Sequence, residues 1–366
     1  MGRGLSWRNF DFLLLGAVAL ASAFGAMMIR SAVAGNEALV LLPNRQIYFA
    51  LAGMLVVVLL ASIDYRYWLS LYAPMYVVMM LFLLSLSGLG QAAFGAQRWF
   101  QVGVLFLQPT EFAKIVVILI LARYFEKSQY DPRDLKWLAR SLVWVWGLVI
   151  WILLQPNLSN VIVTMMIWGG MVWMTGIEPK QLLWLLLAVL VLAIAAFPLL
   201  QPYQQARVVN FILPDPNARH GAVYNVQQAL IAIGSGGLLG KGYGHGTQTQ
   251  LRFLKVRHTD FIFSAVSEEF GIIGGIIVIL MLAFIVWRCI RAAQKARDVA
   301  GAMIAFGVAI LIFFQGAANI AVNLNLIPVS GLPLPFISYG GSGLMALMIG
   351  IGLVQSVVMR HKPLEF

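Results

Sequence analysis

The sequence predicts an all-α integral membrane protein, built as a bundle of ten transmembrane helices. Hydrophobic residues make up 61% of the 366-residue chain, charged residues only 11%, and the mean hydropathy is +0.87. A soluble domain carries about 25% charged residues, so this chain could not cover its surface with polar groups in water. Lipid is the solvent that fits, and we interpret 1–366 as a single polytopic membrane domain.

Ten apolar segments approach the roughly 20 residues that a helix needs to cross a bilayer. We place them at residues 10–29, 47–63, 71–89, 109–125, 141–155, 158–175, 182–200, 261–287, 300–325 and 335–358. The first is longer than the core of a signal peptide, about 7–15 residues, so we interpret it as an uncleaved span. The polar stretch 201–260 is predicted to be a long extracytoplasmic loop between spans seven and eight.

Lysine and arginine gather in alternate short loops, which predicts the orientation of the bundle. With a cytoplasmic N-terminus, the cytoplasmic side carries Arg3, Arg8, Arg66, Arg123, Lys127, Arg133, Lys136, Arg140, Lys180, Arg288, Arg291, Lys295, Arg297, Arg360 and Lys362. The short loops on the other side carry only Arg30, Arg45 and Arg98. Both termini are therefore predicted to be cytoplasmic. The net charge of +11 reflects this orientation rather than nucleic-acid binding.

One carboxylate stands where a basic stretch meets the start of a predicted span. Asp260 follows Arg252, Lys255 and Arg257 and comes directly before the eighth span. Neighbouring cations could hold it ionised, and a carboxylate at the outer interface could accept a proton from a sugar hydroxyl. The alternative is that Asp260 or Thr259 caps the helix, since both residue types are good N-caps. The two roles are compatible.

Two further pairs of ionisable residues lie inside predicted spans. Glu111 and Lys114 are three residues apart, so they share one face of the fourth helix. Such groups usually face a cavity or a partner, which leaves a structural ion pair and a functional role as alternatives. Glu268 and Glu269 lie early in the eighth span, where at least one of them must face inward or pair.

Two segments, one before the fourth span and one before the eighth, could bind an anionic group. Arg98, beside a tryptophan that could anchor the interface, could bind a head group. The glycine-rich stretch 234–246 contains Lys241 and could cradle phosphate through its backbone N–H groups. Its spacing is not that of a Walker A loop, and a flexible turn is the alternative. The histidines show no close metal-ligand spacing, and the single cysteine, Cys289, excludes an internal disulfide.

Two prolines and paired glycines open the last apolar run, in the segment that contains Ser338, Tyr339 and Ser342. They will break or reshape the helix there. Irregular backbone at membrane depth is tolerated where it is buried or lines a cavity. The alternative is close helix packing through small residues.

At these residues the chain resembles the SEDS family (shape, elongation, division and sporulation). Three parts carry the resemblance: residues 95–100 with 108–114, the string His-Thr-Asp-Phe-Ile-Phe at 258–263 with the two glutamates after it, and the string Pro-Phe-Ile-Ser-Tyr-Gly-Gly-Ser at 335–342. The stretch 241–248 resembles the RodA branch of the family more than the FtsW branch. Residues 255–256 depart from the family pattern, which puts little in doubt.

The resemblance implies a peptidoglycan glycosyltransferase of the bacterial plasma membrane that polymerises lipid II for cell elongation and rod shape. The donor would be the growing glycan on undecaprenyl pyrophosphate, and the acceptor the 4-hydroxyl of incoming lipid II, with inversion. Asp260 matches the family's essential carboxylate and is the expected general base at the extracytoplasmic face. Arg98 and Lys241 would stabilise the pyrophosphate, and Glu111 and Lys114 would line the cavity.

Ser338, Tyr339 and Ser342 complete the substrate-binding residues that the resemblance implies. It also implies a class B penicillin-binding protein, a transpeptidase, as partner. No cofactor is required by these residues, although a divalent cation such as Mg²⁺ or Mn²⁺ would help to neutralise the pyrophosphate. The alternatives are an FtsW-type division polymerase, a scaffold for the transpeptidase, and a lipid II flippase, whose path an intramembrane Glu–Lys pair would fit.

Overall fold

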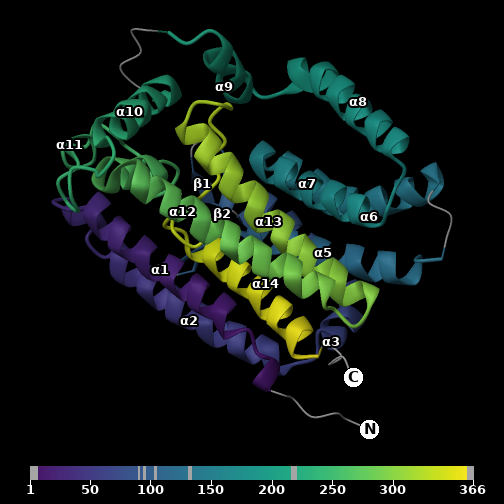
Figure 1. Ribbon diagram of the computed structural model, residues 1–366. Coiled ribbons are helices and arrows are strands. Elements are labelled where there is room, and N and C mark those ends of the chain that lie inside the picture. Colours follow the sequence, from purple (N-terminus) through teal and green to yellow (C-terminus); the bar gives the residue numbers. More distant parts are fainter. Residues whose placement is uncertain are drawn as a thin grey trace.

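The computed structural model describes residues 7–89, 91–93, 96–102, 105–130, 134–215 and 221–360, and helices dominate it (Figure 1). Within these ranges, ten helices of 17 to 33 residues correspond to the ten predicted spans: α1 Phe12–Ala32, α2 Leu42–Ser62, α4 Tyr72–Leu89, α5 Pro109–Lys127, α6 Leu135–Leu154, α7 Leu158–Met174, α8 Pro179–Ala196, α12 Ile262–Gln294, α13 Val299–Asn323 and α14 Gly341–Met359. By length and composition alone, six are long and apolar enough to cross a membrane: α1, α2, α6, α12, α13 and α14.

The centre of the bundle is formed by α5, α13 and α14. Helix α14 packs against α2 and α13, and α13 also packs against α5, α7 and α12 (Figure 1). Almost every side chain of α14 and most of those on α13 are buried, whereas the outer helices expose apolar stripes. On α2, Leu51, Leu55 and Leu59 recur every fourth residue and are 53–63% exposed. Such a stripe suits contact with acyl chains, so the predicted multi-pass membrane protein is confirmed.

The predicted long loop contains helices rather than irregular chain. They are α9 Pro202–Ile212, α10 Gly221–Gly236 and the short α11 Thr247–Gln250. Val226 and Ala229 of α10 pack against Leu254, Phe261 and Val322 in a small core of their own. Burial of this apolar face offsets the cost of ordering the segment, which composition did not reveal.

A small antiparallel sheet precedes α5, and the sequence analysis did not predict it. Its strands are β1 Gln91–Ala93, β2 Ala96–Val102 and β3 Leu105–Leu107, in the order β1-β2-β3. Phe100 of β2 stacks on Phe82 of α4 with ring centroids 5.1 Å apart. The strands are too short for their periodicity to stand out against the apolar background of the chain.

The last helix begins at Gly341, whereas the apolar run predicted a start near residue 335. Residues 335–340 form a turn instead, in which Ile337 and Ser338 donate their N–H groups to the carbonyl of Leu334. Pro333 and Pro335 have no N–H to donate to a helical ladder, and Phe336 adopts a left-handed φ of 65°. A helix could not pass through this backbone.

Candidate active site

Asp260 lies in the turn before α12, with its backbone fixed by α13. Its carbonyl oxygen accepts hydrogen bonds from the side-chain amides of Asn319 and Asn323, each at 2.9 Å. The N-cap position of α12 is Phe261, and no side chain caps it. The interpretation of Asp260 or Thr259 as the helix cap is therefore wrong. Among the described residues, no donor bonds to the Asp260 carboxylate, which leaves it available to a substrate.

The surroundings of Asp260 raise its affinity for a proton. Burial raises the pKa of the Asp260 carboxyl to about 6, and the Arg207 guanidinium partly opposes this by favouring the ionised form. A carboxyl with this pKa is largely ionised at neutral pH yet binds a proton far more readily than a solvated aspartate. These are the properties of an effective general base.

The turn that contains Ser338 and Tyr339 is hydrogen-bonded to the segment that carries Asp260. The Ser338 hydroxyl donates to the carbonyl of Thr259 at 2.6 Å and accepts from the N–H of Leu334 at 2.8 Å. The N–H of Tyr339 donates to the carbonyl of His258 at 2.9 Å. These bonds join two strings that lie about 75 residues apart in the sequence.

Helices α1 and α2 support the same turn from the other side. The Gln46 amide of α2 donates to the carbonyl of Ser338 at 3.2 Å and accepts from the N–H of Gly340 at 3.3 Å. Gly25 of α1 packs so closely that a Cβ atom there would lie 2.5 Å from the carbonyl oxygen of Ile337. The turn is therefore held in place by both helices.

Ser342 connects the start of α14 to the junction of β3 and α5. Its hydroxyl donates to the carbonyl of Phe106 and accepts from the N–H of Gln108, both at 3.0 Å. The hydroxyls of Ser338 and Ser342 are thus both engaged in holding the backbone. Substrate binding by these serines stays a prediction, and their described contacts give them a positioning role.

Glu111 and Lys114 form the predicted pair on one face of α5. The Lys114 ammonium lies 2.8 Å from the Glu111 carboxylate and donates to the Asn160 side chain of α7 at 3.2 Å. The Asn160 amide in turn donates to Thr110 at 3.0 Å. All four side chains are buried. The pair belongs to a satisfied polar network that joins α5 to α7, beside Gly343 of α14.

The glycine-rich stretch fills a break in α12. Gly271 interrupts that helix with φ 67° and ψ −165°, which frees backbone groups on both sides of it. The N–H groups of Lys241 and Gly242 donate to the carbonyls of Glu268 and Glu269 at 3.0 and 2.9 Å. These two donors therefore serve the break and not a phosphate, whereas phosphate binding by the other N–H groups of the stretch stays a prediction.

The two glutamates of α12 are both buried and both engaged, as expected. The Glu268 carboxylate accepts from the Lys241 ammonium at 3.0 Å, and also from the side chain of Thr247 and the backbone of Gln248 and Thr249. Glu269 accepts a hydrogen bond from the Ser31 hydroxyl of α1. Lys241 therefore neutralises a buried carboxylate, and no described contact links it to Asp260.

A cavity of about 250 Å³ is lined by residues from α7, α9, α13 and the segment 327–332, and Asp260 is not among them. Arg207 of α9 lines it and donates to the carbonyl of Val329 at 3.2 Å. Gly331 lies between the lining residues Ser330 and Leu332, and a Cβ atom at Gly331 would lie 3.8 Å from the Asp260 carboxylate. Glu111 and Lys114 are not among the residues that line this cavity.

Arg207 is a site residue that the sequence analysis missed. The signal that could have found it is its place in the amphipathic stretch 202–212, four residues after Tyr203, whose ring lies 5.7 Å from the guanidinium. Arg98 lies on β2, and its side chain is outside the described part of the chain.

The chain matches the family of cell cycle proteins of the FtsW, RodA and SpoVE type over residues 5–363. It is 35% identical to the peptidoglycan glycosyltransferase MrdB of Escherichia coli K12, over 86% of this chain and 84% of that protein. It is 33% identical to the probable peptidoglycan glycosyltransferase FtsW of Geobacter metallireducens, over 96% of this chain and 94% of that protein.

Its fold is also similar to solved structures. The rod shape determining protein RodA of Thermus thermophilus superposes with a TM-score of 0.72 and 28% identity, over 98% of this chain and 99% of that one. A chain of a peptidoglycan synthase complex that coordinates polymerization and crosslinking superposes with a TM-score of 0.81 and 29% identity, over 96% and 98%. The resemblance drawn from the sequence strings is confirmed, and the chain belongs to the FtsW/RodA/SpoVE family of cell cycle proteins.

Proposed function

We propose that this protein is a peptidoglycan glycosyltransferase that polymerises lipid II, with Asp260 as its general base. The observation that carries the proposal is the setting of Asp260. Its backbone is fixed by two hydrogen bonds, and no donor among the described residues bonds to its carboxylate. The pKa of this carboxyl is about 6, and the positive charge of Arg207 favours its ionised form. The activity named for the relatives MrdB and FtsW supports the reaction class.

In the proposed reaction, Asp260 accepts the proton of the 4-hydroxyl of incoming lipid II as that oxygen attacks the anomeric carbon of the growing glycan. The bond from this carbon to the pyrophosphate oxygen breaks, and the undecaprenyl pyrophosphate leaves with the electron pair. Attack from the face opposite the leaving group inverts the anomeric carbon. Arg98 and Arg207 would stabilise the charge on the leaving group. Lys241 would act on the pyrophosphate only indirectly, because its ammonium group is paired with Glu268.

The cavity beside Asp260 supports a place for part of the substrate. Ten of its sixteen lining residues are apolar, and the polar ones are Asn157, Ser159, Tyr203, Gln204, Arg207 and Ser330. An apolar pocket with few polar groups is typical of small-molecule sites. Tyr339, which is partly exposed beside His258, is the member of the 335–340 turn best placed to contact a sugar.

We further propose that both termini are cytoplasmic and that Asp260 faces the extracytoplasmic side. The basic loops at the opposite end of the bundle support this orientation. A class B penicillin-binding protein is the proposed partner, supported by the likeness to a chain of a peptidoglycan synthase complex. A divalent cation would enter with the pyrophosphate, because the described residues offer no group of three or more His, Cys, Asp or Glu side chains to hold one.

The role in elongation and the role in division call for different tests. Both MrdB and FtsW proteins match this chain at 33–35% identity. We propose the elongation role, on the likeness of residues 241–248 to the RodA branch. Rescue of cells depleted of their elongation polymerase, but not of cells depleted of their division polymerase, is the expected result. The reverse pattern would place the chain in division.

The central test is glycan-strand formation from purified lipid II, with and without a matched class B partner. Wild type is expected to form strands, and Asp260→Asn to form none while remaining folded in the membrane. The amide keeps the shape of the carboxyl but accepts no proton. Full activity of Asp260→Asn would overturn the base assignment.

The same components separate the alternatives. If wild type forms no strands even with its partner, a lipid II translocation assay in vesicles distinguishes a flippase, which moves the lipid, from a scaffold, which does not. A flippase is the second candidate because the buried Glu111–Lys114 pair lies within a span.

A further inference from the structure

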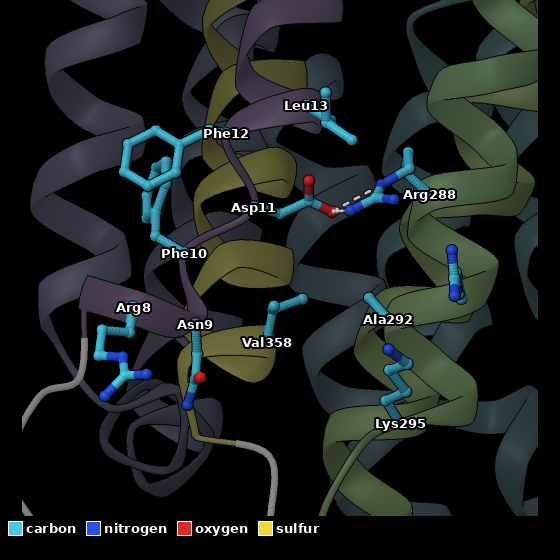
Figure 2. A pocket seen from close by; sticks show the side chains of 11 residues that line it. Arg8, Asn9, Phe10, Asp11, Phe12, Leu13, Arg288, Ala292, Lys295 and Val358 are labelled. Carbon is cyan, nitrogen blue, oxygen red and sulfur yellow. Dashed lines mark hydrogen bonds and ion pairs between the residues drawn. The ribbon is translucent and has the colours of Figure 1, made fainter. Parts of the chain in front are cut away.

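A second cavity, of about 430 Å³, lies at the end of the bundle far from Asp260, between the start of α1 and the end of α12 (Figure 2). Asp260 lies just before the first residue of α12, whereas Arg288, Arg291 and Lys295 of the cavity lie at its far end. Asp11 is the one carboxylate among its lining residues. Four cations also line it: Arg8, Arg288, Arg291 and Lys295.

The charges in the cavity do not cancel. Asp11 binds Arg288 through one carboxylate oxygen, at 2.6 and 2.8 Å from two guanidinium nitrogens (Figure 2). The other Asp11 oxygen caps α1 by accepting from the N–H of Leu14 at 2.9 Å. Arg291 and Lys295 continue the same face of α12, three and seven residues after Arg288. With Arg8 they leave an excess of three positive charges at the cavity.

The cavity is also open to the lipid-facing surface. Phe12 and Leu13 line it and are 66% and 64% exposed. Trp287, 47% exposed, lies directly before Arg288, and the guanidinium groups of Arg288 and Arg291 lie 5.6 and 5.2 Å from its ring. Exposed tryptophan at a helix end marks the depth of the lipid head groups. The cations therefore lie at head-group depth, beside apolar surface that acyl chains can cover.

We propose that this cavity binds the phosphate of an anionic phospholipid head group, which on the proposed orientation belongs to the cytoplasmic leaflet. Basic pockets between helices at this depth suit such head groups. Arg291 and Lys295 contact the phosphate, Phe12 and Leu13 contact the first methylenes of the acyl chains, and Arg288 is held in position by Asp11. A soluble phosphate shares the anionic chemistry but would leave the apolar side uncovered.

The test is native mass spectrometry of the full chain in a neutral detergent, titrated separately with phosphatidylglycerol, phosphatidylcholine and inorganic phosphate. Wild type is expected to bind phosphatidylglycerol at least tenfold more tightly than phosphatidylcholine. Each cation near an anionic head group contributes about fivefold, so Arg291→Gln with Lys295→Gln should weaken binding roughly 25-fold. Both side chains are exposed, so the substitutions remove charge without opening the core.

The control is Lys127→Gln with Arg297→Gln, which removes two exposed cations from the same end of the bundle but outside the cavity. Binding within twofold of wild type is expected. An equal loss in the control would overturn the site in favour of general surface charge. Inorganic phosphate that binds as tightly as phosphatidylglycerol, and displaces it, would overturn the lipid as the ligand. Neither readout depends on polymerase activity.

Discussion

The proton affinity of Asp260 is set by two opposed influences. Burial stabilises the neutral carboxyl, and the positive charge of Arg207 stabilises the carboxylate, with a resulting pKa of about 6. Arg207 lies 53 residues before Asp260 in the chain, yet its charge acts on the Asp260 carboxyl. Position in the fold, rather than distance along the chain, therefore decides which cation matters.

Polymerisation should follow the ionisation of Asp260, because only the carboxylate can accept a proton. The rate is expected to fall about tenfold for each pH unit below pH 6. Arg207→Gln removes the charge that lowers the pKa of Asp260, so its pH–rate profile should move to higher pH. Lys255→Gln should leave the midpoint unchanged. A profile that does not move in Arg207→Gln would show that this cation does not act on the base.

Glu111 and Lys114 should be coupled in stability, because both are buried and each neutralises the other. Lys114→Met leaves a carboxylate buried without its cation, which costs about 3–5 kcal/mol. Adding Glu111→Gln should recover part of this loss, as measured by thermal unfolding in detergent. Purely additive effects would contradict the coupling. If the double variant is folded but polymerises slowly, the pair also serves the reaction.

Among the elements, the 335–340 turn connects the most distant parts of the site. It bonds to the Asp260 segment through Ser338 and Tyr339, to α2 through Gln46, and it packs on α1 at Gly25. A shift of this turn would therefore be transmitted to the backbone around Asp260. The break of α12 at Gly271 is also held by a segment distant in sequence, because N–H groups of the glycine-rich stretch donate to the carbonyls that the break leaves free.

Gly25→Ala tests the support of the turn by α1. The new Cβ atom would lie 2.5 Å from the carbonyl oxygen of Ile337, a backbone atom that cannot rotate away. We expect a stability loss of about 1–3 kcal/mol and slower polymerisation. Gly16→Ala on the same helix is the matched control, because nothing lies within 4 Å of its Cβ position. Equal behaviour of the two variants would contradict a close α1–turn contact.

Across the whole molecule, opposite ends of the bundle carry different chemistry. The end with Asp260 holds the sheet, α9 to α11 and the 335–340 turn, whereas the other end holds the start of α1, the end of α14 and the cationic cavity (Figure 1). The alternation of lysine and arginine along the chain predicts that the end with the cationic cavity is cytoplasmic. Such an arrangement allows a reaction on one side of the membrane and lipid contacts on the other.

Labelling of single cysteines tests the orientation. Cys289 is the only cysteine and is buried, so Cys289→Ala gives a silent background. In that background, Leu239→Cys should react with an impermeant maleimide in intact spheroplasts, and Tyr130→Cys only after lysis. Both positions are well exposed, at 79% and 91%. The opposite labelling pattern would reverse the proposed topology.

Local patterns were sufficient to predict the spans and much of the site. The ten helices, the inward glutamates and the Glu111–Lys114 pair depend on apolar run length and helical spacing, which are properties of neighbouring residues. The role of Arg207 and the use of the Ser338 hydroxyl were not predictable in this way. Both depend on partners more than 50 residues away, and no spacing rule encodes such contacts.

Composition and periodicity alone determined that this chain is a multi-span helical membrane protein, because an apolar chain cannot be solvated by water and lipid demands satisfied backbone. Tertiary structure alone decided which polar groups are available for chemistry. It occupied the donors of Lys241 and Gly242 with the break in α12, occupied the Ser338 hydroxyl with the Thr259 carbonyl, and left the carboxylate of Asp260 without a donor among the described residues. The physical reason is that most buried polar groups find a partner in the folded chain, and packing decides which groups are paired and which stay available.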